Sequence, residues 1–222
     1  MSGATLVADL DRLDAQGFSP IQVALLVSAI ASEREHLERP NTQIELVVTG
    51  LDAQAQARDT LIVVEQLFAE AQQSVLIVGF AIFQGNTIFK TLAKRMMDSP
   101  GLRVVCCFDV ARDRDDNRPE SIIIDDFARR FIKYHWPGSR VPEIYFDRRS
   151  LIADREKRAV LHAKTIVVDG RKALLTSANP TPAAYLRNIE LGIVLTGGEI
   201  PIEIEQYFRS LITDGRLERL PT

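Results

Sequence analysis

The sequence has few of the residues that characterise disulfide-bonded, metal-binding or membrane-spanning proteins. Its 222 residues include two cysteines and three histidines. Cys106 and Cys107 are adjacent in an apolar stretch and have no other thiol to pair with. We therefore expect reduced thiols on opposite faces of a strand, in a cytoplasmic protein. The sequence contains no CxxC or His/Cys cluster that would predict a metal site. It also contains no apolar run of about 18 residues that would predict a membrane span. The acids near the N-terminus do not fit a signal peptide.

The overall charge does not by itself predict a nucleic-acid-binding protein. A net charge of −3, with 46% hydrophobic and 26% charged residues, is ordinary for a soluble globular chain. Positive charge is concentrated locally, because residues 147–172 contain eight Lys or Arg and four acids. This segment fits a polyanionic substrate, and it fits equally well a solvated loop with incidental charge.

The pattern of apolar residues predicts a helical extension over residues 1–40 and an α/β domain over residues 41–222. In the extension we expect helices at 3–15 and 20–38, the second capped by Ser19 with Pro20 at its first position. Strands and helices then alternate, which favours a sandwich with a mostly parallel, mixed sheet flanked by helices. The expected strands lie at 44–50, 74–82, 102–110, 141–146 and 189–195, with a hairpin before the last, and the expected helices at 58–71, 86–98, 121–134, 181–187 and 199–213.

Ligands of such sheets bind near the carboxyl ends of the strands. Polar or aromatic residues follow three of the expected strands there, and each on its own is more often structural than functional: Phe80 and Gln84, Asp109 and Arg112, Tyr145 and Asp147. Gly79, among buried strand residues, is expected to allow a close approach of the backbone to the site.

The hairpin is predicted by Asp169-Gly170, a dipeptide typical of tight turns in which both residues have positive φ. Within the flanking strands, His162 and Lys164 share one face, and Ser177 and Asn179 share one face. A two-residue loop would place His162 opposite Ser177, and a four-residue loop would place it opposite Asn179. Both loops bring the four side chains together, whereas a loop of odd length would separate the pairs.

The residue types in this hairpin suit a bound anion, because an imidazole, an ammonium, a hydroxyl and an amide converge without an acid among them. Neutral imidazole, here His162, is a nucleophile and a general acid or base near pH 7. The other three groups can hold the oxygens of a phosphoryl group. Further along, Asn188 and Glu190 begin the last strand. The Glu190 carboxylate would accept a hydrogen bond from Nδ1 of His162 and fix its tautomer.

The spaced pattern resembles the HKD signature of the phospholipase D superfamily. The matching positions are His162-x-Lys164-x(4)-Asp169, then Ser177-x-Asn179 and Asn188-x-Glu190. Two positions depart from the family pattern, since Thr176 stands where the family usually has Gly and Pro180 where an aromatic residue is common. Both departures bear on the shape of the pocket, and neither removes a reacting group. For Asp169, a role in the turn and a part in the chemistry remain equal alternatives.

The resemblance implies a phospholipase D-like fold and a phosphodiesterase that needs no metal and no other cofactor. Because only one HxK occurs, it implies a homodimer with the active site at the two-fold interface. His162 of one subunit would attack phosphorus to form a phosphohistidine, and His162 of the other would protonate the leaving oxygen and then activate water. Lys164, Ser177 and Asn179 would hold the phosphoryl oxygens, and Glu190 would orient His162.

Over nearly its full length, the sequence also resembles phospholipase D-like proteins of the bacterial anti-phage system DISARM. The segments that carry this resemblance are 47–60, 74–85, 135–138 and 161–179. It implies a nuclease acting on nucleic acid, DNA above all, beside other defence-system proteins and with no membrane partner. Two further classes stay open: a phosphodiesterase of phospholipid headgroups, and a non-catalytic subunit that binds nucleic acid. The basic flank favours the first class over the lipid enzyme, and the intact motif favours either enzyme over the binding subunit.

Overall fold

The computed structural model describes residues 12–13, 15–37, 42–50 and 58–221, and the chain divides into two compact units, Met1–Asn41 and Thr42–Thr222. In the first unit, α2 (Pro20–Leu37) begins as predicted: the backbone N–H of Gln22 donates to Ser19 Oγ at 3.4 Å, and its side chain accepts from the Ser19 N–H at 2.9 Å. The helix expected over residues 3–15 lies mostly outside the described residues. No helix within the described part of the chain is long and apolar enough to cross a membrane.

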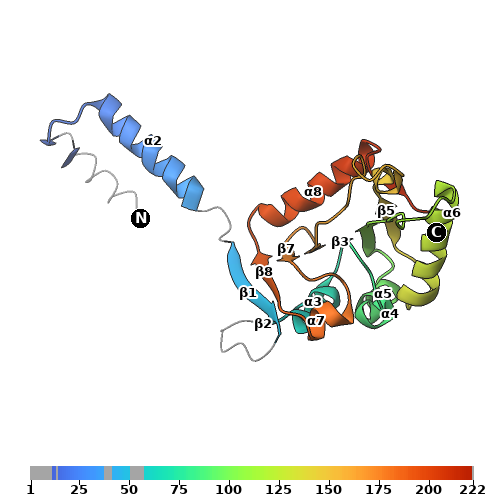
Figure 1. The fold of residues 1–222 in the computed structure, drawn as a ribbon. Helices are drawn as coiled ribbons and strands as arrows, with labels where there is room; N and C mark the ends of the chain where they lie inside the picture. The colour runs from blue at the N-terminus through green and yellow to red at the C-terminus, as the bar shows by residue number, and fades with distance from the viewer. Residues whose placement is uncertain (1–11, 14, 38–41, 51–57, 222) are drawn as a thin grey trace. The chain divides into compact units, whose positions relative to one another are not determined.

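The second unit is built on a sheet to which its described residues contribute nine strands, in the order β2-β1-β8-β7-β6-β3-β4-β5-β9 (Figure 1). The strands are β1 (Gln43–Thr49), β2 (Arg58–Asp59), β3 (Ser74–Gly79), β4 (Arg103–Phe108), β5 (Glu143–Phe146), β6 (Thr165–Val168), β7 (Lys172–Thr176), β8 (Glu190–Thr196) and β9 (Glu218–Arg219). The helices are α3 (Thr60–Glu70), α4 (Gly85–Ile88), α5 (Lys90–Asp98), α6 (Glu120–Arg130), α7 (Pro182–Leu186) and α8 (Ile200–Thr213), with a π-helical turn at Phe131–His135 and a 3-10 turn at Arg148–Leu151.

The α/β class and the mixed sheet are confirmed, but the expected majority of parallel pairs is not. Parallel pairing joins β1 to β2, β3 to β4 and β4 to β5, whereas the other five neighbouring pairs are antiparallel. The difference arises at the centre of the sheet, where β6 and β7 are joined by a tight turn. A turn of this length can join only antiparallel strands.

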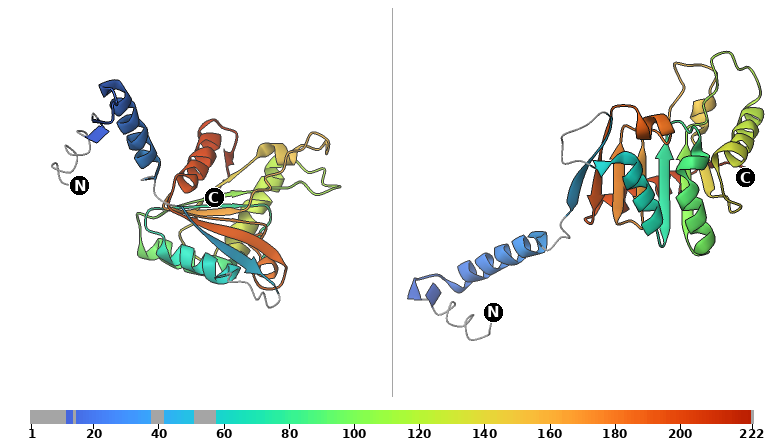
Figure 2. Two further views of the ribbon diagram at one scale, coloured as in Figure 1. Left: turned by 90° about the vertical axis from the view of Figure 1, so that its left-hand side faces the viewer. Right: turned by 90° about the horizontal axis from the view of Figure 1, so that it is seen from below.

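Two hydrophobic cores cover the two faces of the sheet, and Figure 2 shows α8 on one face with α3 and α5 on the other. Cys106 belongs to the core under α3 and α5, and Cys107 to the core under α8 with Phe208, so the predicted opposite orientation is confirmed. Burial raises the pKa of Cys107 to about 12, which leaves the thiol protonated and unreactive.

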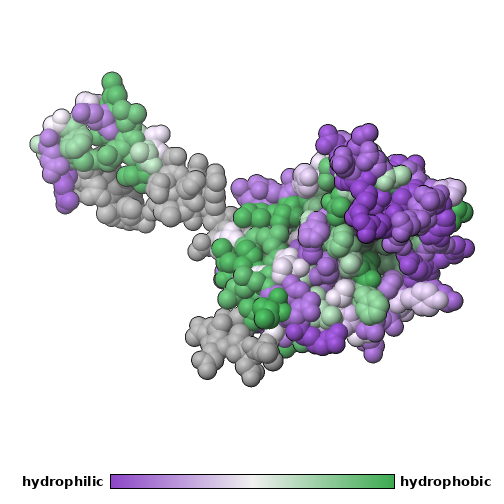
Figure 3. All heavy atoms as spheres, viewed as in Figure 1, coloured by the Kyte–Doolittle hydropathy of each residue, from purple (hydrophilic) through white to green (hydrophobic). Residues whose placement is uncertain are grey.

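Apolar side chains are also exposed along the outer part of the sheet. Ile44 of β1 is 66% exposed and Leu191 of β8 is 61% exposed. Figure 3 shows apolar side chains gathered on this side of the second unit. The helix α8 contacts β6, β7 and β8, while α3 and α7 contact β1, and the side chains of Ile44 and Leu191 remain exposed.

The turn of the central hairpin has three residues, 169 to 171, and this corrects both expected registers. Val168 pairs with Lys172 and Thr165 with Leu175. Asp169 (φ +55°) and Gly170 (φ +61°) have the predicted positive φ, but the Arg171 N–H closes the turn by donating to the Val168 carbonyl at 3.0 Å. The loop is thus of odd length, and the ladder places neither Ser177 nor Asn179 opposite His162 or Lys164, whereas both expected registers required such a pairing. The ladder places Lys164 opposite Thr176, with a hydrogen bond of 3.2 Å from the Thr176 N–H to the Lys164 carbonyl.

Candidate active site

The site lies where β6 begins beside the carboxyl end of β3. Because these strands are antiparallel, with Val78 paired to Thr165, the residues just before β6 meet the residues just after β3. Phe80 follows β3, and its ring packs against the imidazole of His162 with centroids 5.0 Å apart. The Lys164 Nζ lies 5.7 Å from the centroid of the Phe80 ring. Phe80, predicted as a cleft-lining residue, therefore forms the wall behind the candidate nucleophile.

His162 and Lys164 project side by side, as their spacing predicts. The Lys164 Nζ lies 3.3 Å from His162 Nδ1 and 3.4 Å from Nε2, and it donates to the His162 carbonyl at 2.8 Å. The imidazole is exposed, whereas the lysine is half-buried. Burial lowers the pKa of Lys164, and the nearby Glu190 carboxylate acts in the opposite sense. A nucleophilic ring and a cation are thus presented together at the surface.

Ser177 lies just beyond the end of β7 and is bonded to the start of β8. Its hydroxyl donates to Glu190 Oε2 and accepts from the Leu191 N–H at 3.2 Å. The other oxygen of Glu190 accepts from Asn188 Nδ2 at 3.1 Å. Both carboxylate oxygens are therefore held by Ser177 and Asn188. The expected hydrogen bond from His162 to Glu190 is absent from the described contacts, since the carboxylate is already oriented by its own strand.

Asn179 presents an unusual polar group. Its side-chain Oδ1 is buried without a hydrogen-bond partner among the described residues. A buried amide oxygen left unpaired costs about 1–3 kcal/mol, and such a cost points to function. With Oδ1 turned inward, Nδ2 is the atom of this side chain that remains to meet a ligand.

Pro180, which replaces the aromatic residue common in the family pattern, packs on the backbone of β3. A Cβ built on Gly79 would lie 3.1 Å from both Cδ and Cγ of Pro180. The Phe83 N–H also donates to the Pro180 carbonyl at 3.4 Å. Gly79 therefore allows the close approach that the sequence led us to expect, and the segment carrying Asn179 is seated directly on β3.

Asp169 is not brought to the other candidate residues. It lies at the opposite end of β6, roughly 20 Å along an extended chain from His162. Its carboxylate accepts from the backbone N–H groups of Gln72, Gln73 and Ser74 at distances of 2.7–3.2 Å. Of the two roles left open by the sequence, this position favours the structural one.

Other predicted cleft residues hold the segment that leads to His162. The buried Asp109 accepts from the Leu161 N–H at 3.0 Å, and burial raises the pKa of this carboxyl group. Asp147 lines the hollow beside His162, where its carboxylate is paired with Arg149. Arg112 is buried and its guanidinium donates to the Leu151 carbonyl at 2.7 Å. These residues are structural, in line with the more common role of polar groups at such positions.

The basic flank is largely neutralised in the folded chain. Four of its eight cations pair with carboxylates: Arg148 with Glu120 and Glu218, Arg149 with Asp147, Lys157 with Asp154, and Lys172 with Glu70. Arg158 donates to backbone carbonyls. Arg155, Lys164 and Arg171 have no carboxylate partner among the described residues. The positive field at the site therefore comes from fewer groups than the sequence count suggests.

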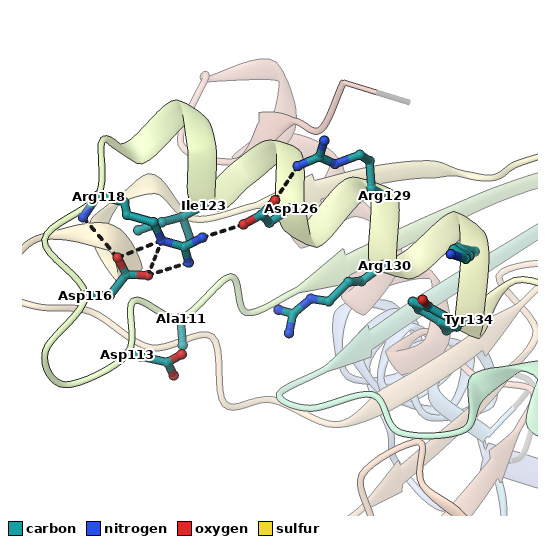
Figure 4. A pocket seen from close by; sticks show the side chains of 10 residues that line it. Ala111, Asp113, Asp116, Arg118, Ile123, Asp126, Arg129, Arg130 and Tyr134 are labelled. Atoms are coloured by element: carbon teal, nitrogen blue, oxygen red, sulfur yellow. Dashed lines mark hydrogen bonds and ion pairs between the residues drawn. The ribbon is translucent and has the colours of Figure 1, made fainter.

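Two hollows open near this edge of the sheet. One, of about 570 Å³, is lined by His162, by Tyr207 of α8 and by Arg216, which sequence reasoning did not connect with the site. The other, of about 530 Å³, lies between the loop after β4 and α6 (Figure 4) and contains none of the predicted site residues. There Arg118 binds Asp116 and Asp126, so its charge is already satisfied. No group of three His, Cys, Asp or Glu within the described ranges could hold a metal ion.

Comparisons with known proteins identify relatives over most of the chain. The family model for "Cardiolipin synthase, PLD-like domain" matches residues 64–212. The DISARM protein DrmC of Bacillus paralicheniformis is 25% identical over 218 residues, which cover 96% of this chain and 79% of DrmC.

Among the solved structures that share the fold, two illustrate the likeness. NucT from Helicobacter pylori has a TM-score of 0.51 and 16% identity, with 78% of this chain and 97% of NucT covered. A phosphatidylserine synthase from Haemophilus influenzae Rd KW20 has a TM-score of 0.51 and 14% identity, with 81% of this chain and 40% of that chain covered. At these identities the likeness concerns the fold alone.

Proposed function

The chain belongs to the phospholipase D-like superfamily, and from this premise we propose that it is a metal-independent phosphodiesterase that cleaves nucleic acid through a phosphohistidine intermediate. The observation that carries the proposal is the pair formed by the exposed His162 imidazole and the Lys164 ammonium, 3.3 Å apart. The pair supplies a nucleophile and a cation for the phosphoryl oxygens at one exposed place. The chemistry therefore needs no metal ion to neutralise the phosphate.

In the first step, a ring nitrogen of His162 attacks phosphorus. The N–P bond forms as the bond from phosphorus to the leaving oxygen breaks, and the leaving oxygen takes a proton from His162 of the partner subunit. The product of this step is a phosphohistidine and a free hydroxyl group on one fragment.

In the second step, water attacks the same phosphorus. His162 of the partner subunit, now neutral, takes a proton from the water, the new P–O bond forms, and the N–P bond breaks to release His162. The proposal requires a homodimer because each chain has one HxK sequence. The exposure of His162 supports it, since a buried ring could not meet a second copy.

The other polar groups would hold the phosphate. Lys164 Nζ and Asn179 Nδ2 are hydrogen-bond donors that suit the equatorial oxygens, where charge accumulates during transfer. The Ser177 hydroxyl would join them by turning its one hydrogen from Glu190 to the phosphate. Glu190 is assigned a different part from the one the family pattern suggests. It accepts from Ser177 and Asn188 and so orients these two side chains, while the Phe80 ring orients His162. Asp169 has no part in this scheme.

The relationship to the DISARM protein DrmC supports nucleic acid as the substrate and defence against phage as the role. It extends over 96% of the chain, which includes the candidate site. DNA is the substrate we infer, with other defence proteins as partners.

A phospholipid substrate is the second candidate. It is favoured by the matching family description, which names cardiolipin synthase, and by the fold shared with a phosphatidylserine synthase. Both candidates are phosphodiesters and would use the same histidine. A non-catalytic subunit that binds DNA in the same pocket is the third.

The deciding experiment incubates the purified full chain in EDTA with single-stranded DNA, duplex DNA or cardiolipin vesicles. The proteins compared are the wild type, His162→Asn and Lys164→Ala. Lys94→Ala, which removes an exposed lysine outside the site, is the matched control. Cleavage of DNA that His162→Asn and Lys164→Ala abolish and Lys94→Ala retains supports the proposal. If only the lipid is turned over, the chain is a phospholipid phosphodiesterase, the second candidate. If the wild type binds DNA but does not cleave it, the chain is a non-catalytic DNA-binding subunit, the third candidate.

A further inference from the structure

The hollow beside His162 is a groove between α8 and the segment that precedes β6. One wall consists of residues 160–163, and the other includes Tyr207 and Phe208 of α8. Its volume of about 570 Å³ is in the range of pockets for small organic ligands. The groove is thus large enough for a group attached to a phosphate that His162 would attack.

Tyr207 presents its ring to this groove without being part of a core. The side chain is 59% exposed, whereas the neighbouring Phe208 is buried in the core under α8. The two rings meet edge to face with centroids 5.3 Å apart. Because Phe208 anchors this turn of the helix, the place of Tyr207 at the rim is set by packing while its own ring stays available.

Arg216 brings a free cation to the same groove. At the end of α8, Gly215 adopts a left-handed conformation (φ +69°) that turns the chain back. The Arg216 N–H then donates to the Leu211 carbonyl at 2.8 Å, which fixes the turn. Two other arginines of the groove, Arg148 and Arg149, are bound to carboxylates. The exposed Arg216 has no ion pair in the part of the chain that the structure describes.

An accessible aromatic ring together with an unpaired arginine is the combination that binds single-stranded nucleic acid. Bases of a single strand stack on aromatic side chains, and the adjoining phosphates pair with cations. In a duplex the faces of the bases are already stacked on each other. A phospholipid headgroup offers no planar group to stack, and acyl chains would meet arginines in this groove.

We propose that this groove binds the nucleotide next to the scissile phosphate of a single-stranded nucleic acid, with the base stacked on Tyr207 and the following phosphate paired with Arg216. The inference rests on the proposed function and narrows its substrate to single strands.

Binding is tested first, because it does not require turnover. A fluorescent single-stranded oligonucleotide and a duplex of equal length are titrated with the full chain carrying His162→Asn, so that neither is cut. To this background we add Tyr207→Ala, Tyr207→Phe or Arg216→Ala. Two matched controls are Tyr134→Ala, an exposed tyrosine (54%) that lines the other hollow, and Arg171→Ala, an exposed arginine in the hairpin turn.

Loss of the stacking ring is expected to weaken single-strand binding by about 5- to 100-fold, which Tyr207→Phe restores because it keeps the ring. Arg216→Ala is expected to reduce the slope of log affinity against log salt by about 0.7. Neither control changes binding of the single strand. In the catalytically intact chain, Tyr207→Ala raises KM more than it lowers kcat, because stacking beside the reacting phosphate is equal in the ground and transition states.

Equal single-strand affinity of Tyr207→Ala and its background, or an equal loss in Tyr134→Ala, overturns the inference. So does a preference of the wild type for duplex. Failure of the proposed function has another signature: wild type and His162→Asn hydrolyse bis(p-nitrophenyl) phosphate at the same background rate, whatever the binding data show.

Discussion

Replacing Asp169 separates its structural role from a catalytic one. Its carboxylate accepts from the N–H groups of Gln72, Gln73 and Ser74, and its own φ of +55° lies in the left-handed region. Three substitutions distinguish these features. Asp169→Asn keeps one acceptor and tolerates this φ, Asp169→Gly tolerates the φ without an acceptor, and Asp169→Ala has neither property.

The magnitudes follow from the number of hydrogen bonds lost. A hydrogen bond to a charged group contributes about 1.5–3 kcal/mol to the free energy of unfolding. Because the Asp169 carboxylate is partly exposed to water, we expect its hydrogen bonds together to contribute near the lower end of that range. Strain at positive φ adds about 1 kcal/mol for alanine. We therefore expect destabilisation of about 2–4 kcal/mol for Asp169→Ala, somewhat less for Asp169→Gly and about 1–2 kcal/mol for Asp169→Asn.

Thermal unfolding followed by circular dichroism measures the effect, and phosphodiesterase turnover well below the melting temperature measures any part in catalysis. For a chain of this size each kcal/mol shifts Tm by about 2–4 °C, so Asp169→Ala should melt about 4–16 °C lower. Turnover of the folded variants should stay within about twofold of the wild type, because the carboxylate lies at the far end of β6. Variants that melt like the wild type yet lose turnover as His162→Asn does would refute this reasoning.

Two further predictions concern β8 and the lysine of the motif. Gly192→Ala should destabilise the chain by about 1–3 kcal/mol in urea unfolding, because a Cβ would lie 2.7 Å from the Leu175 carbonyl oxygen. As a control, Gly101→Ala should be neutral or slightly stabilising, because a Cβ there would have no atom within 4 Å. Equal stability of the two variants would contradict the packing argument. Burial lowers the pKa of Lys164 from its usual 10.5, so the ammonium is lost, and kcat falls, as pH rises through a value below 10.5. In Lys164→Arg this alkaline limb should disappear from the pH–rate profile, and a limb that stays in place would assign it to another group.

The parts of the site that the sequence predicts are those that depend on residues close together in the sequence, at the start of β6 and of β8. His162 and Lys164 project together because residues two apart share a face, and Asn188 and Glu190 are hydrogen-bonded for the same reason. The positive φ of both turn residues was also predictable, since Asp169-Gly170 favours it at both positions.

The register of the hairpin was not predictable from that dipeptide. Whether the loop has two, three or four residues depends on where Arg171 finds its partners, and these include the N–H of Gly197, which donates to the Arg171 carbonyl at 2.8 Å. The role of Asp169 was hidden for a similar reason, because the N–H groups that it binds lie just before β3 and at its first residue, far away in the sequence. Contacts of this kind depend on tertiary structure, and no periodic pattern of residues in the sequence predicts them.

Strand direction and the groove were beyond the reach of the pattern as well. A continuous apolar run such as that of β3 or β4 indicates that both faces of the strand are covered. It does not indicate whether the neighbouring strand runs parallel or antiparallel. Tyr207 and Arg216 read as surface residues of a terminal helix. Only the position of α8 over β6 and β7 brings them beside His162.

The order of strands has a consequence for how the protein can be made. The hairpin of the candidate site, β6 and β7, lies in the middle of the sheet between β3 and β8. Strand β1 joins the rest of the sheet through β8, with Gln43 paired to Thr196. On the ribosome, the first strand must therefore wait without a neighbour on that side until residue 196 has emerged from the exit tunnel. Until Glu190 has emerged, the Ser177 hydroxyl lacks the carboxylate to which it donates, so this part of the candidate site forms only when synthesis is nearly complete.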